Sequence, residues 1–174
     1  MSARPGTRRP DWRRGGASVL LLALVLFVQI GCGEADPDAG QALKIVDDVT
    51  GWFDVGIVEG QNKIVPTVSF KIQNIASRPI HSVQLNAVFR IVGDEEELGS
   101  MLLKGIDSSG LAANAAAGPF VARSNIGYTG QEPRNQMLQN RHFRDAQVEI
   151  FAKQGGKQWV KLGTFKIARQ LLTT

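Results

Sequence analysis

The chain has 174 residues, of which 43% are hydrophobic, and it carries 20 lysines and arginines against 16 aspartates and glutamates. Residues 1–31 hold five of the basic residues and one of the acidic ones, so the rest of the chain has 15 of each and no net charge. Nucleic-acid binding is therefore not expected, because it needs a basic face that displaces counterions from phosphates. The single cysteine, Cys32, excludes an intramolecular disulfide.

The first 31 residues have the parts of a secretory signal peptide. Five arginines precede a nearly uncharged apolar run over residues 17–30, and the small residues Gly31 and Cys32 follow it. This order is typical of an exported protein. The run is shorter than the ~18–20 apolar residues of a membrane-spanning helix. An uncleaved N-terminal anchor is the alternative interpretation.

Ile30-Gly31-Cys32 resembles the end of a bacterial lipobox, although the usual leucine three residues before the cysteine is replaced by Gln29. The resemblance implies that Cys32 is acylated and becomes the new N-terminus. It also implies a lipoprotein of the bacterial cell envelope that faces the periplasm or the exterior. Membrane lipid is then a partner through the acyl chains on Cys32.

The rest of the chain divides into a linker and one domain. Residues 32–41 are small, acidic and without apolar periodicity, as is typical of a flexible tether. Residues 42–174 are enough for a single domain with its own core. We therefore expect a signal peptide over residues 1–31, a tether over residues 32–41 and a β-sandwich domain over residues 42–174.

Alternation of apolar and polar residues predicts an all-β domain. The clearest cases are residues 64–74 and 80–92, which we expect to be neighbouring strands of one sheet, joined by a polar turn. Glycines at 155 and 156 predict a tight hairpin, because glycine accepts positive φ. The spacing favours an antiparallel sandwich of seven to eight strands, with a closed barrel as the alternative. The predicted strands are 43–49, 52–58, 64–74, 80–92, 98–103, 120–128, 146–153 and 159–167.

The order of features also resembles the immunoglobulin-like accessory domains of bacterial envelope proteins, of the CARDB and FxLYD kind. The matching stretches are Ile72-Gln73-Asn74, then residues 89–94, then Gly118-Pro119-Phe120. Phe89, Ile91 and Asp94 approximate the Phe-x-Leu-Tyr-Asp signature of such domains. The resemblance implies an immunoglobulin-like sandwich that acts as a binding or spacer module.

The sequence lacks patterns that indicate catalysis or a metal site. His81 and His142 lie far apart, and no nucleophile elbow or phosphate-binding loop occurs. The acidic residues 94–97 lack the spacing of a calcium loop. Trp52, Phe53 and Trp159 could form a sugar-stacking platform, but aromatic residues in strands more often pack in the core. We therefore expect no enzyme, no catalytic residue, no metal and no cofactor.

The stretch from Tyr128 to Arg144 is long for a connection between strands, and such loops often carry function. Pro133 predicts a short helix here, on which arginines would lie beside apolar anchors. The candidate binding residues are Tyr128, Arg134, Arg141, His142 and Arg144, and the expected partner is anionic, such as an envelope protein or peptidoglycan. In the alternative interpretation, Met137, Leu138 and Phe143 close one end of the sandwich and the arginines are solvated.

The leading functional hypothesis is a membrane-anchored, non-catalytic envelope lipoprotein that acts as a binding or structural module. A carrier of an apolar ligand in a β-barrel is one alternative, and an enclosed apolar cavity would distinguish it. A hydrolase or transferase with a carboxylate-based site is the other, and carboxylates of perturbed pKa converging in a cleft would distinguish it.

Overall fold

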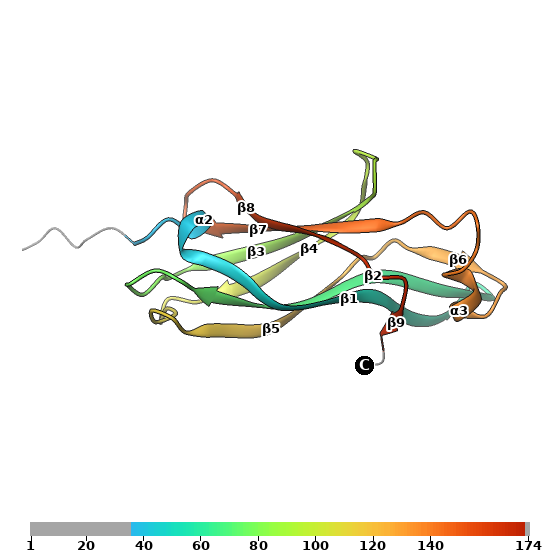
Figure 1. The fold of residues 1–174 in the computed structure, drawn as a ribbon, viewed down its shortest axis with the longest axis horizontal. Coiled ribbons are helices and arrows are strands. Elements are labelled where there is room, and N and C mark those ends of the chain that lie inside the picture. The colour runs from blue at the N-terminus through green and yellow to red at the C-terminus, as the bar shows by residue number, and fades with distance from the viewer. Residues whose placement is uncertain (1–35, 173–174) are drawn as a thin grey trace, which may run out of the picture. The chain divides into compact units, whose positions relative to one another are not determined.

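The computed structural model describes residues 36–172, which form two packed β-sheets and two short helices (Figure 1). The signal peptide and the acylation predicted for Cys32 lie outside the described residues. The helices are α2 (Ala39–Ala42) and α3 (Arg134–Met137). The strands are β1 (Leu43–Val58), β2 (Gln61–Asn74), β3 (Val83–Ile91), β4 (Glu97–Ile106), β5 (Ala116–Arg123), β6 (Tyr128–Gly130), β7 (Ala146–Gln154), β8 (Val160–Lys166) and β9 (Leu171–Leu172).

The strand order is that of an immunoglobulin-like sandwich. One sheet has the order β5-β2-β1-β9, with β6 also paired to β2, and the other has the order β4-β3-β7-β8. If β1, β2 and β5 are named A, B and E, the second sheet is C′CFG, as in that fold. Pairing is antiparallel except between β1 and β9. The predicted fold class is confirmed, with nine strands in the described part of the chain, because β6 and β9 are short additions.

The core lies between the two sheets and follows the predicted alternation. On β2 the inward side chains include Phe70 and Ile72, and on β3 they include Leu85 and Phe89; all four are fully buried. Burial of a large apolar side chain contributes roughly 1.5–3 kcal/mol, so these alternating residues supply much of the driving force for folding. The alternation predicted for residues 64–74 and 80–92 therefore does mark the buried face of each strand.

The expectation that residues 64–74 and 80–92 are neighbours in one sheet is wrong. β2 and β3 belong to different sheets and face each other across the core. The connection crosses between the sheets because Asn74 is fully buried and holds it there. Its side-chain amide donates hydrogen bonds to the carbonyls of Arg78 (2.8 Å) and Leu111 (3.0 Å) and accepts one from Ala76 N (3.0 Å). Period-two alternation shows which face is buried but does not identify the neighbouring strand.

The two strands predicted over residues 43–49 and 52–58 form one continuous strand, β1. Its pairing with β2 shifts between Val46 and Val49, where Asp47 adopts a φ of 52°, so a bulge replaces the predicted break. Gly51 lies within this strand, where the absence of a side chain lets β9 pack closely against β1. A Cβ atom on Gly51 would lie 2.8 Å from the Leu172 side chain of β9.

The predicted strand over residues 120–128 is divided into β5 and β6. Ser124 causes the division: its hydroxyl bonds the carbonyls of Leu98 (3.0 Å) and Ile126 (2.7 Å) and accepts from Ile126 N. Side-chain hydrogen bonds of this kind compete with strand pairing. The hairpin predicted at Gly155 is confirmed, since β7 and β8 pair on either side of it and its φ is 53°.

The domain begins earlier than predicted, inside the segment interpreted as a tether. Asp38 caps α2 by accepting a hydrogen bond from Gly40 N at 2.9 Å, and Ala39 is buried. Asp36 bonds His81 Nδ1 (3.3 Å) and Gln154 Nε2 (3.2 Å). Residues 36–41 therefore belong to the folded domain.

The strand registers define two ends of the sandwich, shown in Figure 1. The end that contains α2, the β2–β3 and β4–β5 connections and the β7–β8 turn is called the tether end. The end that contains the β1–β2 turn, the β3–β4 turn, β6 and α3 is called the far end. The 16-residue β1 runs between them, and at ~3.3 Å per residue it spans about 50 Å.

Candidate functional site

The long stretch after β5 folds against the far end. β6 pairs with residues 62–64 of β2, and Asn62 Nδ2 donates a hydrogen bond to the Glu132 carbonyl at 2.9 Å. Gly127 lets the chain approach β2, because a Cβ atom there would lie 2.0 Å from Ile64 O. Pro133 then precedes α3, so the predicted short helix is confirmed.

Three aromatic rings form the floor beneath this stretch. Phe143 lies 4.8 Å from Trp52 and 4.5 Å from Tyr128, measured between ring centroids, and Trp52 lies 5.5 Å from Tyr128. Met137 and Leu138 are also buried here. Tilted and edge-on aromatic pairs contribute about 0.5–1.5 kcal/mol beyond the area that they bury. The apolar residues therefore close one end of the sandwich, as the alternative interpretation of this stretch proposed.

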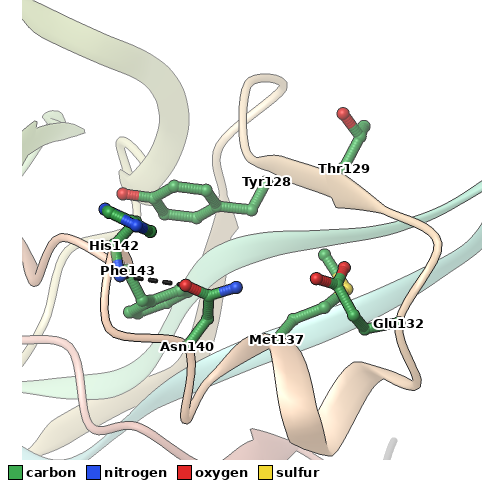
Figure 2. A pocket seen from close by; sticks show the side chains of 7 residues that line it. All are labelled: Tyr128, Thr129, Glu132, Met137, Asn140, His142 and Phe143. Carbon is green, nitrogen blue, oxygen red and sulfur yellow. Dashed lines mark hydrogen bonds between the residues drawn. The ribbon is translucent and has the colours of Figure 1, made fainter.

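A pocket of about 210 Å³ opens above this floor (Figure 2). Its apolar wall consists of the Tyr128 and Phe143 rings and the Met137 side chain. Its polar groups come from Thr129, Glu132, Asn140 and His142. Asn140 Oδ1 accepts a hydrogen bond from His142 N at 2.9 Å, which orients the amide so that its Nδ2 donor points over the pocket in Figure 2.

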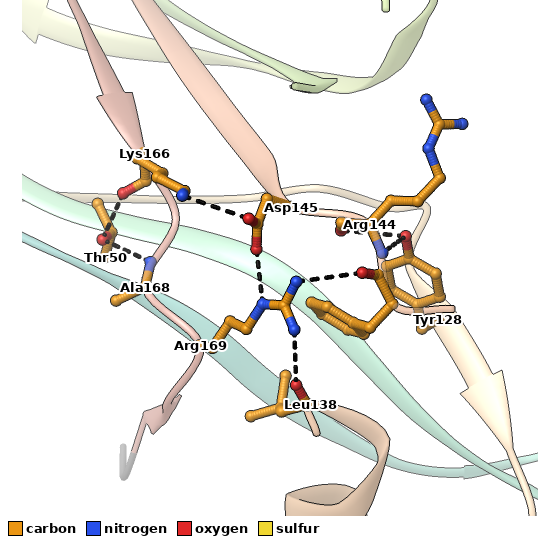
Figure 3. A network of polar contacts seen from close by, with 9 residues as sticks. Thr50, Tyr128, Leu138, Arg144, Asp145, Lys166, Ala168 and Arg169 are labelled. Atoms are coloured by element: carbon orange, nitrogen blue, oxygen red, sulfur yellow. Dashed lines mark hydrogen bonds and ion pairs between the residues drawn. The ribbon is translucent and has the colours of Figure 1, made fainter. Parts of the chain in front are cut away.

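Arg169, which follows β8, holds the segment after α3 in place (Figure 3). Its guanidinium donates to Asp145 Oδ1 at 2.6 Å, to Phe143 O at 3.2 Å and to Leu138 O at 3.4 Å. The same guanidinium lies 5.1 Å from the Phe143 ring centroid. Tyr128 adds a second tie, since its hydroxyl donates to Arg144 O and accepts from Arg144 N. The pocket wall is thus fixed by side chains that the sequence separates widely.

The predicted binding residues divide between the pocket and its surroundings. Tyr128 and His142 line the pocket. Arg134 instead pairs with Asp54 of β1, and Arg144 pairs with Asp94 at 3.3 Å. Arg141 Nε donates to His142 Nε2 at 3.0 Å. Arg134 and Arg144 therefore pair with separate carboxylates, whereas Arg141 contacts His142, another of the predicted binding residues.

No sequence pattern marks Glu132, Asn140 or Arg169 as site residues. Glu132 and Asn140 looked like ordinary loop residues, and nothing local connects Arg169 to a loop that ends 25 residues earlier. The three aromatic residues considered for a sugar-stacking platform are also separated. Trp52 is buried in the core, Arg123 covers the Phe53 ring at 3.6 Å, and Trp159 lies just before β8, near Lys153.

Four carboxyl groups have pKa values held below their usual range, each for a local reason. A hydrogen bond from Glu96 N, followed by one from Arg144, lowers the pKa of Asp94. Hydrogen bonds from Ser109 lower the pKa of Asp107. The Arg169 hydrogen bond is the main cause for Asp145, and the Lys161 hydrogen bond is the main cause for Glu149. All four favour the ionised form.

Among residues 36–172, no three His, Cys, Asp or Glu side chains gather closely enough to hold a metal ion. Over the same residues, no helix has the length and apolar character needed to cross a membrane.

No protein-family model matches the chain, and no curated protein matches it. Among solved structures, the chain is similar to the X-ray structure of Northeast Structural Genomics Consortium target SoR45, with 10% sequence identity and a TM-score of 0.42. The matched region covers 75% of this chain and 89% of that chain. The function must therefore be argued from the residues themselves.

Proposed function

We propose that the protein is a membrane-anchored, non-catalytic envelope lipoprotein that binds a partner at the far end of its sandwich. The anchor is Cys32, which lies four residues before Asp36. Four residues span at most ~14 Å, so acyl chains on Cys32 keep the tether end close to the bilayer. The pocket lies at the other end of the strands and stays available to partners in the envelope.

The observation that carries this proposal is the construction of the pocket. The Tyr128 and Phe143 rings of its wall pack on the buried Trp52 ring, and Arg169 and Tyr128 fix the segment that lines it. A merely solvated connection between β6 and β7 needs no such support. Sites that recognise ligands combine a rigid apolar wall with a few oriented polar groups, which is the arrangement found here.

The chemistry of the pocket favours a neutral or cationic group over an anion. Among the described residues, the Glu132 carboxylate is the one acidic group that lines the pocket, whereas Arg134 and Arg144 pair with Asp54 and Asp94. The Asn140 amide adds a donor and Thr129 adds a hydroxyl. A volume of about 210 Å³ suits one side chain or one sugar ring. Peptidoglycan and envelope proteins both present such hydroxyl, amide and amine groups.

Two observations favour binding over the alternative functions. The carboxyl groups of Asp94, Asp107, Asp145 and Glu149 have pKa values lowered by hydrogen bonds with structural roles, and none of the four lines the pocket. A carrier needs an enclosed apolar space. In this sandwich the fully buried rings of Trp52, Phe70 and Phe89 fill the interior instead.

Site-specific photo-crosslinking in intact envelopes tests the proposal. A photoreactive residue at Thr129, on the pocket rim, should capture one discrete partner or glycan fragment. The same residue at Lys44, exposed on β1 near the tether end, serves as the control and should not give that product. Glu132→Gln keeps the size of the side chain but removes the carboxylate charge, so it should reduce capture. Identical products from positions 129 and 44, or none from 129, would contradict the proposal.

A further inference from the structure

The outer face of the β4-β3-β7-β8 sheet has an uneven distribution of charge, which becomes clear from the strand register. Residues paired directly across antiparallel strands share a face. Lys104, Gln84 and Lys153 form one outward row near the tether end, and Leu102, Asn86, Phe151 and Lys161 form the next. These two rows contain three lysines and no acidic residue.

The turn after β7 extends this cationic surface. Lys157 is exposed in the turn and donates a hydrogen bond to Gln154 Oε1 at 2.8 Å. Lys153 Nζ lies 5.9 Å from the centroid of the Trp159 ring. Lys161 pairs with Glu149 at 2.7 Å, but Arg90 also pairs with that carboxylate, so the three side chains together keep a positive charge.

Apolar side chains lie among these lysines. Leu102 is 62% exposed and Trp159 is 38% exposed. Tryptophan is enriched where proteins meet the interface of a bilayer, and lysine side chains extend their charge toward the headgroups. We name this surface the basic face and define it as Leu102, Lys104, Lys153, Lys157, Trp159 and Lys161.

The basic face adjoins the point where the chain enters the domain. Gln154, the residue after Lys153, donates a hydrogen bond to Asp36. Helix α2 also lies close to β8, since a Cβ atom on Gly40 would lie 3.5 Å from the Val160 side chain. At the far end of the same sheet, the β3–β4 turn contains the acidic residues Asp94 to Glu97, of which Asp94 pairs with Arg144. An anionic surface would therefore attract the lysines of these two rows and repel the β3–β4 turn.

We propose that the basic face lies on the anionic headgroups of the bilayer that holds the acylated Cys32. This inference rests on the proposed function and names a second contact of the protein with the membrane. Stable membrane attachment commonly combines acyl chains with a basic patch. The contact tilts the sandwich so that the acidic β3–β4 turn and the pocket point away from the bilayer.

The test uses the chain from residue 33 onward, so that it does not depend on acylation. Residues 36–172 contain the whole core described above, and this shorter chain keeps it. The probe is co-sedimentation with vesicles of equal parts phosphatidylglycerol and phosphatidylcholine, compared with phosphatidylcholine alone. The protein should bind the mixed vesicles only. Raising the salt to about 1 M, where the Debye length is ~3 Å, should release it.

Matched double variants locate the contact. Each lysine near an anionic surface contributes about fivefold to partitioning, so Lys104→Gln with Lys153→Gln should weaken it roughly 30-fold. Lys44→Gln with Lys71→Gln makes the same charge change near the tether end of the other sheet and should leave binding nearly unchanged. Brominated lipid should quench Trp159 emission, and Trp159→Phe should remove that quenching while the buried Trp52 remains unaffected.

The results separate the two proposals. No binding to mixed vesicles at low salt, or equal losses in both double variants, would overturn the membrane contact of the basic face. Neither result would affect acylation of Cys32, which this chain lacks. Conversely, vesicle binding by the unacylated chain would stand even if Cys32 proved unmodified in cells.

Discussion

Arg169 Nε donates a hydrogen bond to Asp145 Oδ1 at 2.6 Å. This bond joins the segment after β8 to the residue that immediately precedes β7. Lys166 approaches the other oxygen of the same carboxylate at 3.3 Å. Because Arg169 also bonds two carbonyls of the pocket segment, this pair couples the pocket wall to the framework. Its loss should loosen the far end without exposing the core between the sheets.

Asp145→Asn should lower the free energy of unfolding at neutral pH by about 1–2 kcal/mol, because hydrogen bonds to charged groups contribute ~1.5–3 kcal/mol and solvent screens this partly exposed carboxylate. The pKa of Asp145 is lowered in the folded protein, so its contribution is present above the unfolded value of ~3.9. It is lost as the pH falls through the lower folded value. Urea melts of both proteins between pH 7 and pH 3 should therefore converge in acid. A constant difference at every pH would contradict this account.

Truncation of the core aromatics tests the register of the two sheets. Phe70→Ala or Phe89→Ala should cost roughly 3–5 kcal/mol, because each ring is fully buried. Lys71→Ala and Gln84→Ala change outward side chains on the same strands and should stay within about ±0.5 kcal/mol. Urea melts measure all four. Similar losses at positions 70 and 71 would mean that the faces of β2 are assigned wrongly.

Gly127 should be intolerant of a side chain. A Cβ atom there would lie 2.0 Å from Ile64 O, so Gly127→Ala must separate β6 from β2 and should cost more than about 2 kcal/mol. Gly156→Ala is the control, because nothing lies within 4 Å of its Cβ position. Thermal unfolding of both variants gives the comparison. Equal midpoints would show that the chain at residue 127 can move without cost.

Arg134→Ala and Arg141→Ala should differ in their effects on the far end. Arg134 pairs with Asp54 and its side chain is 29% exposed, so its loss should cost about 1 kcal/mol. Arg141 is exposed and bonds only its neighbour His142 among the contacts described, so its loss should change stability by less than ~0.5 kcal/mol. Chemical denaturation resolves the two. A larger loss at Arg141 would show that the helix and the loop after it are held differently.

The sequence predicted the strands better than their partners, and the reason is physical. Alternation around Phe70 and Phe89 reports burial of one face, and burial acts on each strand separately. Whether β2 pairs with β3 depends on the crossover held by Asn74, whose acceptors at Arg78 and Leu111 come from two different connections. No local pattern contains that information.

The sequence indicates where the candidate site lies but not how its pocket is built. The length of the stretch from Tyr128 to Arg144 indicated a site, and Pro133 indicated its helix. The carboxylates that pair with Arg134 and Arg144 are Asp54 on β1 and Asp94 in the β3–β4 turn, so the local sequence around the arginines does not show these pairs. Arg169 was missed because its contact with Asp145 exists only after β7 and β8 have paired.

The most direct test of the central claim is mass spectrometry of the N-terminal peptide of the mature protein isolated from cell envelopes. The membrane-anchored function predicts that the peptide begins at Cys32 and carries acyl chains on that residue. Cys32→Ala should abolish both the cleavage and the lipid mass, while the folded domain, which begins at Asp36, remains intact. A mature protein that begins elsewhere, or that carries an unmodified Cys32, would contradict the account.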